Sequence, residues 1–552
     1  MARRLFHRGF ALSVVTLIVL RLILISHDEV LASPYDGAAY IGQAAGWYWK
    51  NPYNHWTYSR QPGYPLFLAL SSMLGIPARL TIEALWIGTS LLLCRALRAA
   101  GVGMPGRLLL LAALLFHPIP TQLFCHVNSE NLYTCSFIVL VVSLAMGMTH
   151  RNRRGMFRCG LLAGFSGAIA GISRQETVLV YVLIVLSGVL IVKAWVLQRV
   201  PRRLVFRRLA LAFALPLAMA IVAEQAVRAR NQARIGMHAM YDWSLPGLAS
   251  LYQAMLSVPP ESPRLRVPMP LDVRERVASA SPLYASLLEL MNTHPRCEPY
   301  RRVGETTTGV PGEPGSYNLW LMREAAWLLH DDRFADAREA NDFYAAVASE
   351  IRAAQDRGAL PRRWAPLSFV PPEWGQLPLE VTRSIGACWT SLTRIGFSRV
   401  EPGEVAEDDL LRFDAVALRR SALLRPDPAP GVYWHRPRVV QRLDRVKLAI
   451  AGALPIATAA CLVIAALGGV AARFARAPVS HSWYALSALL WAAFVLRLLL
   501  VATLDATGVL ASTRYMMPSA VVLVPLTVLG LHALRQLALK RRAQPSSPVA
   551  ML

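Results

Sequence analysis

The sequence is poor in charged residues and especially poor in acids. Only 17% of its 552 residues are charged, with 34 Asp or Glu against 58 Lys or Arg, while 55% are hydrophobic. This composition excludes an intrinsically disordered chain, and the length exceeds that of one ordinary soluble domain. Seven cysteines over this length exclude a small disulfide-stapled scaffold.

Several nucleotide-binding and catalytic patterns are also absent. The chain has no GxxxxGK[ST] phosphate-binding loop, so ATP-driven transport by this chain has no support. It has no GxSxG elbow, no HExxH helix and no paired CxxC motif. We therefore expect no cofactor, and no metal site is indicated, although a divalent metal is compatible with the sequence.

The formal net charge of +24 by itself suggests a nucleic-acid partner. The distribution of the charges along the chain indicates otherwise. Residues 227–445 contain 28 basic and 26 acidic side chains, so nearly all of the excess lies in the apolar remainder of the chain. Cytoplasmic loops of integral membrane proteins are enriched in Lys and Arg. We therefore expect membrane lipids as partners and no nucleic acid.

The apolar segments predict an all-α polytopic membrane protein with about ten transmembrane helices, since a spanning helix needs about 20 apolar residues. The predicted domains are an N-terminal membrane module at 1–226, a mainly helical extracytoplasmic domain at 227–445, C-terminal spans at 446–537 and a cytoplasmic tail at 538–552. Within the first module, the outer loop 28–79 carries interfacial helices. The ten predicted spans are 9–27, 80–99, 107–124, 130–148, 158–173, 176–196, 207–226, 446–471, 482–504 and 516–537.

The positions of the charges predict the sidedness. With the N-terminus inside, 22 of the 30 basic residues outside 227–445 lie on the inner side. The prediction is a multi-pass protein of a bacterial-type inner membrane, with both termini cytoplasmic and the 227–445 domain periplasmic. All eight acids outside 227–445 lie in or near the outer side: Asp28, Glu29, Asp36, Glu83, Glu130, Glu176, Glu224 and Asp505.

Two apolar segments need separate interpretation. Residues 64–78 are short and bounded by proline, and a span there would invert every later loop, so we predict an interfacial or re-entrant helix. The N-terminus resembles a signal peptide with a cleavage point near 30–33. We predict a retained signal anchor, because Arg21 interrupts the apolar run.

The 227–445 region contains one strong helical pattern. Phe343, Val347, Ile351 and Ala354 recur at helical spacing, and Gly358 is suited to end that helix. The same region contains two cysteines, Cys297 and Cys388, which could form a disulfide in an oxidising compartment or remain free thiols.

The first outer loop holds the first candidate for chemistry. Asp36 is followed by an aromatic stripe that includes Tyr40, and Arg60 precedes a Pro-Gly-Tyr-Pro turn containing Tyr64. The stripe favours an amphipathic helix in the outer interface. Asp36 is either a general base held at the membrane surface or the N-cap of that helix, and the local sequence favours the cap.

The other candidates also have a structural interpretation. Glu130 could serve only the first turn of its helix, capped by Ser129 or Asn128. Arg174 and Glu176 could form a purely local ion pair. Arg21 and Arg497 interrupt apolar runs, and such arginines either face a buried partner or snorkel to the interface; we expect snorkelling for one of the two. Two further candidates, Arg514 and Tyr515, open the last span.

The predicted topology places distant charged residues on one face. Carboxylates and arginines at an outer interface suit a reaction of an anionic, lipid-linked substrate, because a carboxylate can accept a proton from a hydroxyl and an arginine can bind a phosphate. The residues brought together are Asp36, Arg60, Glu130, Arg174, Glu176, Asp505 and Arg514.

The order of these motifs resembles the GT-C membrane glycosyltransferases, in particular the protein O-mannosyltransferase and lipid A aminoarabinose transferase group. The resemblance covers about 1–226 and the last spans, and the 227–445 insertion matches nothing in it. Many members carry Asp-Glu where this chain has Asp36-Gly37, which leaves Asp36 as the single matching acid. The matching stretches are Asp36 to Tyr40 with Ala44, Arg60 to Pro65, Pro118 and Pro120 with Glu130, Gly160 to Gly171 with Arg174 and Glu176, and Arg514-Tyr515 with Pro518.

The resemblance implies transfer of a sugar from a polyprenyl-phosphate donor to a glycan, lipid or protein acceptor on the outer side, usually with inversion. It implies that Asp36 deprotonates the acceptor hydroxyl and that Arg174, Arg497 or Arg514 binds the departing phosphate. Glu130 and Glu176 would orient these groups, with Tyr40, Arg60, Tyr64 and Tyr515 as further substrate-binding candidates.

Two alternatives stay open. A glycan polymerase or ligase also joins lipid-linked sugars outside the membrane. A non-enzymatic transporter of a lipid-linked sugar is the other, but its ionisable residues should lie near the bilayer midplane. The gathering of acids at one face favours an enzyme.

Overall fold

The computed structural model describes residues 2–26, 36–54, 57–198, 201–365, 373, 375–395 and 438–543. Over these residues the chain is helical and has no β-strand beyond one isolated bridge, so the predicted all-α class is confirmed. Asp28, Glu29 and the candidate cleavage point at 30–33 lie outside the described residues.

Nine helical segments of the described part are long and apolar enough to cross a membrane. The first predicted span corresponds to α1 (Ala2–Ile25), whose apolar part, Gly9–Ile25, is shorter than the nine. The nine segments are α4 (Ala78–Ala99), α5 with α6 (Met104–Leu115 and Pro118–Leu123), α7 (Ser129–Thr149), α8 (Arg153–Ser173), α9 (Thr177–Gln198), α10 (Arg202–Arg208) with a π-helical turn (Leu209–Ala214) and α11 (Leu215–Ile235), α21 (Leu454–Arg473), α22 (His481–Ala506) and α23 (Thr513–Ala543).

Two predicted spans need correction. The segment 107–124 is interrupted, because Pro118 has no N–H to continue α5 and instead opens α6. The predicted span 446–471 begins too early. Residues 446–452 belong to α20 (Arg438–Gly452), and α21 starts only at Leu454, with Pro455 in its first turn.

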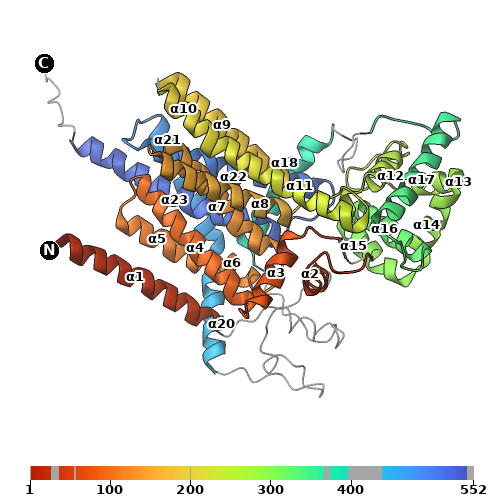
Figure 1. Ribbon diagram of the computed structural model, residues 1–552, viewed down its shortest axis with the longest axis horizontal. Helices are drawn as coiled ribbons and strands as arrows, with labels where there is room; N and C mark the ends of the chain where they lie inside the picture. The colour runs from red at the N-terminus through yellow and green to blue at the C-terminus, as the bar shows by residue number, and fades with distance from the viewer. Residues whose placement is uncertain are drawn as a thin grey trace.

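The membrane helices form a bundle, and a second group of helices covers one end of it (Figure 1). We call this second group, α12 to α17, the helical head. The start of α1 and the end of α23 lie at the opposite end of the bundle. The members of the head are α12 (Pro246–Leu256), α13 (Leu271–Ala280), α14 (Pro282–Thr293), α15 (Glu298–Thr308), α16 (Asn318–Leu329) and α17 (Ala337–Asp356).

The helical head has its own apolar core. Val347, Ile351 and Ala354 are fully buried in it, and Phe343 is packed against it, so the helix predicted from their spacing is confirmed. Gly358, just after α17, has a φ of +76°, which glycine adopts without strain.

One helix of the 227–445 region does not join the head. Helix α18 (Leu377–Thr393) packs against α22 and α23, and its Cys388 and Leu392 are buried in the core of the bundle. Cys297 is buried in the core of the head instead. All seven cysteines are free, so the Cys297–Cys388 disulfide is excluded in this structure.

Two short helices lie between bundle and head. The segment predicted as interfacial or re-entrant forms α3 (Gly63–Met73), which has 11 residues and is too short to span. It packs against α2 (Asp36–Ala45), α4 and α8. Tyr40, Tyr64 and Leu68 share a small buried cluster here, which fixes α2 and α3 to the end of the bundle.

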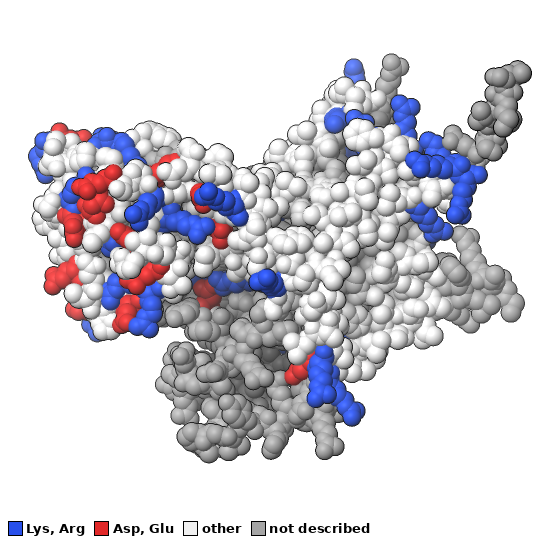
Figure 2. Space-filling model, turned by 180° about the vertical axis from the view of Figure 1, so that it is seen from behind, with Lys and Arg blue, Asp and Glu red and all other residues white. Residues whose placement is uncertain are grey.

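The charges on the surface are unevenly distributed (Figure 2). On the face shown, the end of the bundle away from the head carries Lys and Arg with almost no acids, whereas the head carries both signs. Between them lies a band of mainly uncharged surface, with one group of charges of both signs at its lower edge. Such a band is expected of helices that face lipid.

The contact between α21 and α23 generates a stability prediction. A Cβ on Gly468 would lie 2.1 Å from the Gly530 Cα, whereas a Cβ on Gly469 would have no heavy atom within 4 Å. We expect Gly468→Ala to lower the free energy of unfolding by about 1–3 kcal/mol, because the two helices must move apart. The matched control, Gly469→Ala, should be neutral or stabilising by up to about 1 kcal/mol. Unfolding midpoints of the purified protein in detergent would test this; equal midpoints for the two variants would contradict the close packing.

Candidate active site

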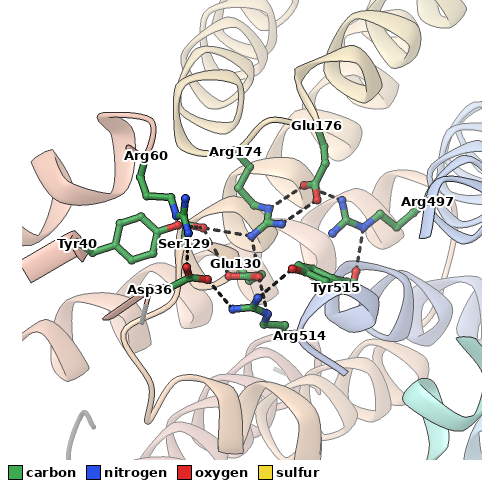
Figure 3. A network of polar contacts seen from close by, with 10 residues as sticks. All are labelled: Asp36, Tyr40, Arg60, Ser129, Glu130, Arg174, Glu176, Arg497, Arg514 and Tyr515. Atoms are coloured by element: carbon green, nitrogen blue, oxygen red, sulfur yellow. Dashed lines mark hydrogen bonds and ion pairs between the residues drawn. The ribbon is translucent and has the colours of Figure 1, made fainter. Parts of the chain in front are cut away.

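A network of arginines and carboxylates (Figure 3) lies at the end of the membrane bundle where Arg60 contacts Trp320 of the helical head. Its members come from the start of α2, the loop before α3, the start of α7, the turn between α8 and α9, the middle of α22 and the start of α23. They are Asp36, Tyr40, Arg60, Ser129, Glu130, Arg174, Glu176, Arg497, Arg514 and Tyr515.

Asp36 is held by two arginines. Its Oδ1 accepts a hydrogen bond of 2.5 Å from Arg60 Nη2, and its Oδ2 accepts one of 2.9 Å from Arg514 Nη1. Burial alone would raise the pKa of this carboxyl, but the two guanidiniums outweigh it and hold the pKa well below its ordinary range. The carboxylate of Asp36, in the first turn of α2, is therefore engaged in ion pairs with two arginines.

Arg514 also links Asp36 to Glu130. The Glu130 carboxylate is 2% exposed and lies 2.7 Å from Arg174 Nη1 and 3.6 Å from Arg514 Nε. Asn128 precedes α7 without a side-chain capping bond. Glu130 does lie in the first turn of α7, but the interpretation that it serves only that turn is wrong, because its carboxylate pairs with arginines from two other segments.

Ser129 joins α2 to this part of the network. The Tyr40 hydroxyl donates to Ser129 Oγ at 2.9 Å, and Arg174 Nη1 donates to the same oxygen at 3.2 Å. Burial raises the pKa of Tyr40 to about 12, with the Asp36 charge adding to the effect. Tyr40 therefore stays protonated and acts as a hydrogen-bond donor.

The pair predicted between Arg174 and Glu176 is present and is part of a longer chain. Arg174 donates from Nε and Nη2 to the two Glu176 oxygens at 2.8 and 2.9 Å. Glu176 Oε2 also lies 2.8 Å from Arg497 Nη1, and Arg497 Nε donates to the Tyr515 carbonyl at 2.9 Å. A purely local ion pair is thus the wrong description, since Glu176 also connects α22 to the site.

Neither intramembrane arginine snorkels to an interface. Arg497 is fully buried against Glu176, and its guanidinium lies over the Tyr133 ring at 5.3 Å. Arg21 is fully buried as well, with Glu83 Oε1 at 2.6 Å and Thr121 Oγ1 at 2.5 Å. The expectation of snorkelling for one of them is wrong, because each finds a carboxylate inside the bundle.

Two of the predicted site residues, Asp505 and Tyr64, have no ion pair or hydrogen bond to the network among the described contacts. Asp505 lies outside the network and accepts hydrogen bonds from Ser384 Oγ at 2.7 Å and Ala511 N at 2.8 Å, which ties α18 to α22. Tyr64 is buried, with its ring edge-on to Tyr40 at a centroid distance of 5.1 Å. Tyr515, in contrast, joins the network, since its hydroxyl accepts a hydrogen bond from Arg514 Nη2 at 2.9 Å.

The network has more positive than negative charge. It contains four arginines and three carboxylates, and its charged side chains differ in access. Arg514 is 31% exposed and Arg60 17%, whereas Arg497 is inaccessible. An incoming anion could therefore reach Arg514 and Arg60 but not Arg497. No cluster of three His, Cys, Asp or Glu that could hold a metal occurs within the described residues.

The sequence pattern does not indicate two of the residues that contact the network. Ser129 is predicted only as a cap, although its hydroxyl oxygen accepts hydrogen bonds from Tyr40 and Arg174. Trp320, whose ring lies under the Arg60 guanidinium, comes from the 227–445 region, where no motif pointed to the site.

The fold and the site together define an all-α, multi-pass membrane protein with a charged site at one end of its bundle. No protein-family profile and no curated protein sequence matches the chain. Similar solved structures include ArnT from Cupriavidus metallidurans bound to undecaprenyl phosphate, with 12% identity and a TM-score of 0.34 over 96% of this chain and 77% of that chain. The apo state of the same protein has 13% identity and a TM-score of 0.33 over 97% and 78%.

The bridging position of Glu176 generates a prediction about stability and pH. Burial opposes ionisation of Glu176, but Arg174 and Arg497 lower its pKa from the ordinary value near 4.5 to about 2. The pairing should therefore stabilise the fold fully above pH 4.5 and be lost as the pH falls towards 2. We expect Glu176→Gln to lower the free energy of unfolding by about 3 kcal/mol at pH 7, because Arg497 stays buried without a carboxylate.

The control is Glu298→Gln, which removes an exposed pair with Arg302 on the head and should change stability by less than about 1 kcal/mol. Thermal unfolding between pH 3 and pH 8 measures both. If Glu176→Gln kept the wild-type stability at pH 7, the bridging role would be excluded.

Proposed function

We propose that this chain is a membrane glycosyltransferase that moves a sugar from a polyprenyl-phosphate donor to an acceptor hydroxyl on the outer, periplasmic side of a bacterial-type inner membrane. The observation that carries the proposal is the net-positive network in which two accessible arginines hold the single carboxylate Asp36 at one end of a membrane bundle. Polyprenyl phosphate supplies the anion that such a network lacks.

The arginines account for binding and departure of the phosphate. A guanidinium can hold two phosphate oxygens in a planar fork and stabilise the charge that develops as the phosphate leaves. Arg514 is the most exposed arginine of the network and would make the main contact. Arg174 lies behind it, 14% exposed and held by Glu130 and Glu176. The two glutamates thus orient the phosphate-binding arginines.

Asp36 would act as the general base. The acceptor oxygen attacks the anomeric carbon, the bond from that carbon to the phosphate oxygen breaks, the phosphate leaves with the electron pair, and Asp36 takes the acceptor proton. A single displacement of this kind inverts the anomeric carbon. The low pKa that the two arginines impose makes Asp36 a weak base before substrate binds.

Binding of the donor would increase the basicity of Asp36. A phosphate that attracts Arg514 removes one of the two cations from Asp36 and frees its Oδ2. The pKa of Asp36 then rises, and its basicity increases only when the donor is in place. The same exchange keeps the carboxylate ionised and oriented by Arg60 throughout.

The charge distribution supports the outer location. The site lies beside the helical head, whereas the start of α1 and the end of α23 lie at the far end of the bundle (Figure 1). That far end carries the unbalanced Lys and Arg, as cytoplasmic loops do (Figure 2). The head would then lie in the periplasm, above the site, where it can shape the acceptor-binding region.

The activity test compares wild type with Asp36→Asn in detergent or in liposomes supplied with polyprenyl-phosphate sugars. We expect sugar transfer to fall by about 10²–10⁴-fold, the range that a positioned base contributes. Asp356→Asn is the matched control, because that carboxylate is 69% exposed on the head, and it should transfer at the wild-type rate.

Two outcomes would count against the proposal. Equal rates for wild type and Asp36→Asn would remove the base assignment. If only lipid-linked oligosaccharides were consumed, and never a lipid-linked monosaccharide, a polymerase or ligase would replace the proposed transferase.

The orientation has its own test, in a cysteine-free variant of the chain. Arg153→Cys places a probe at the exposed start of α8, and Arg302→Cys places one on the head, where Arg302 is 76% exposed. A membrane-impermeant maleimide should label the second probe in intact spheroplasts and the first only after permeabilisation, because Lys and Arg mark the cytoplasmic side. The reverse pattern would invert the proposed topology.

A further inference from the structure

The helical head touches the site through an aromatic side chain. Trp320, in the first turn of α16, has its ring centroid 4.9 Å from the Arg60 guanidinium carbon. The ring is in turn packed against two other aromatic rings, one in the turn before α12 and one in α15. Its centroid lies 4.0 Å from that of Trp243 in a tilted arrangement and 6.0 Å from that of Tyr300 in a stacked one.

A buried ion pair fixes the surroundings of Trp320. Asp242, next to Trp243, accepts hydrogen bonds from Arg323 Nη2 at 2.7 Å and from the Tyr53 hydroxyl at 3.0 Å. Arg323 also lies over the Trp243 ring at 5.3 Å. Buried charges need such partners, so Asp242, Arg323 and the neighbouring rings form a rigid unit.

The same unit holds the backbone next to Arg60. The amide of Asp242 donates to the Tyr58 carbonyl at 2.9 Å, two residues before Arg60. The Tyr48 hydroxyl donates to the Arg60 carbonyl at 2.8 Å. Asp242 and Trp320 thus hold this loop and the Arg60 side chain from outside the loop, while Tyr48 fixes the Arg60 backbone from within it.

Contact with the Trp320 ring restricts the direction in which Arg60 can donate. A guanidinium is planar, and its N–H groups point outwards in that plane. With Trp320 against it, the guanidinium has fewer orientations, and the one present directs Nη2 at Asp36 Oδ1. Arg514 differs, because its aromatic partner is the adjacent Tyr515 and no residue of the head is stacked on it in the described structure.

We propose that Trp320 is a positioning residue: its ring holds the Arg60 guanidinium on Asp36, so that the helical head keeps the base in place while Arg514 moves to the donor phosphate. The catalytic part of this inference rests on the proposed glycosyltransferase activity. The positioning part rests only on the contact between Trp320, Arg60 and Asp36.

Other ionisable groups also face this pair and enter any pH dependence. They are charged or phenolic side chains from α2, α7, α15, α16, α23 and the segments beside them. The groups that face Asp36 are Arg60, Arg514, Tyr40 and Tyr317, and Glu130 reaches it through Arg514. The groups that face Arg60 are Tyr40, Tyr241, Tyr300 and Arg323.

The test compares Trp320→Met with Trp320→Phe in the full-length protein. Methionine fills much of the space but has no aromatic face, whereas phenylalanine keeps one. We expect Trp320→Met to lower kcat by about tenfold with less than a twofold change in the donor KM, and Trp320→Phe to recover most of the loss. The acid limb of the pH profile should move to higher pH in Trp320→Met, because a less firmly held cation lowers the pKa of Asp36 less. Trp364→Met, at a side chain 72% exposed in the segment after α17, is the matched control and should behave as wild type.

A double-mutant cycle separates positioning from general damage to the head. If Trp320 acts through Arg60, Trp320→Met should have no further effect in an Arg60→Ala background. An equal loss in both backgrounds, or equal behaviour of the Met and Phe variants, would overturn the proposal.

A series of fluorinated tryptophans at position 320 tests the same role without the risk that the variant fails to fold. Mono- to tetrafluorotryptophan at position 320 keeps the shape of the ring and weakens its negative face step by step. The infrared band of the Asp36 carboxylate, identified by its absence in Asp36→Asn, should titrate at progressively higher pH along this series. An unchanged titration would refute the positioning role. This readout needs no turnover, so a wild-type protein that transferred no sugar would refute the proposed function and leave the infrared result to decide the role of Trp320.

Discussion

The pairing of buried charges at one end of the bundle is the constraint on which the site depends. A carboxylate or guanidinium removed from water costs several kcal/mol unless a partner of opposite charge compensates it. Arg497 and Glu176 are both buried, so α22 must meet the turn between α8 and α9. Glu130 likewise requires Arg174 and Arg514. These pairs bring together segments from both ends of the sequence.

The same pairs have two opposite effects on the proposed chemistry of Asp36. Two arginines hold Asp36 ionised and oriented, and they also suppress its basicity. Arg60 is stacked on the head through Trp320, whereas Arg514 is more exposed and is shared with Glu130. In the proposed mechanism Arg60 stays on Asp36 while Arg514 moves to the donor phosphate. The network contains one more cation than anions, so an anionic ligand would balance its charge.

Much of this site could be predicted from sequence, because the membrane reduces the possible arrangements to two sides. The alternation of basic loops and scarce acids placed Asp36, Glu130, Glu176 and Arg514 on one face. The pairings could not be predicted in the same way. The spacing of Arg174 and Glu176 suggested a local pair, and only the approach of α22 shows that Arg497 shares Glu176. Side chains in contact across the fold have no fixed separation along the chain.

The sequence by itself determined the helical class, nearly all of the apolar segments and the separation of charge into two ends. These properties follow from local composition, since an apolar run in lipid must satisfy its backbone hydrogen bonds as a helix. Only the tertiary structure decided that Arg21 and Arg497 face buried carboxylates, that α18 joins the bundle and that Trp320 reaches Arg60. These outcomes depend on how helices distant in sequence pack together. That packing sets whether a charged side chain meets lipid, water or an opposite charge.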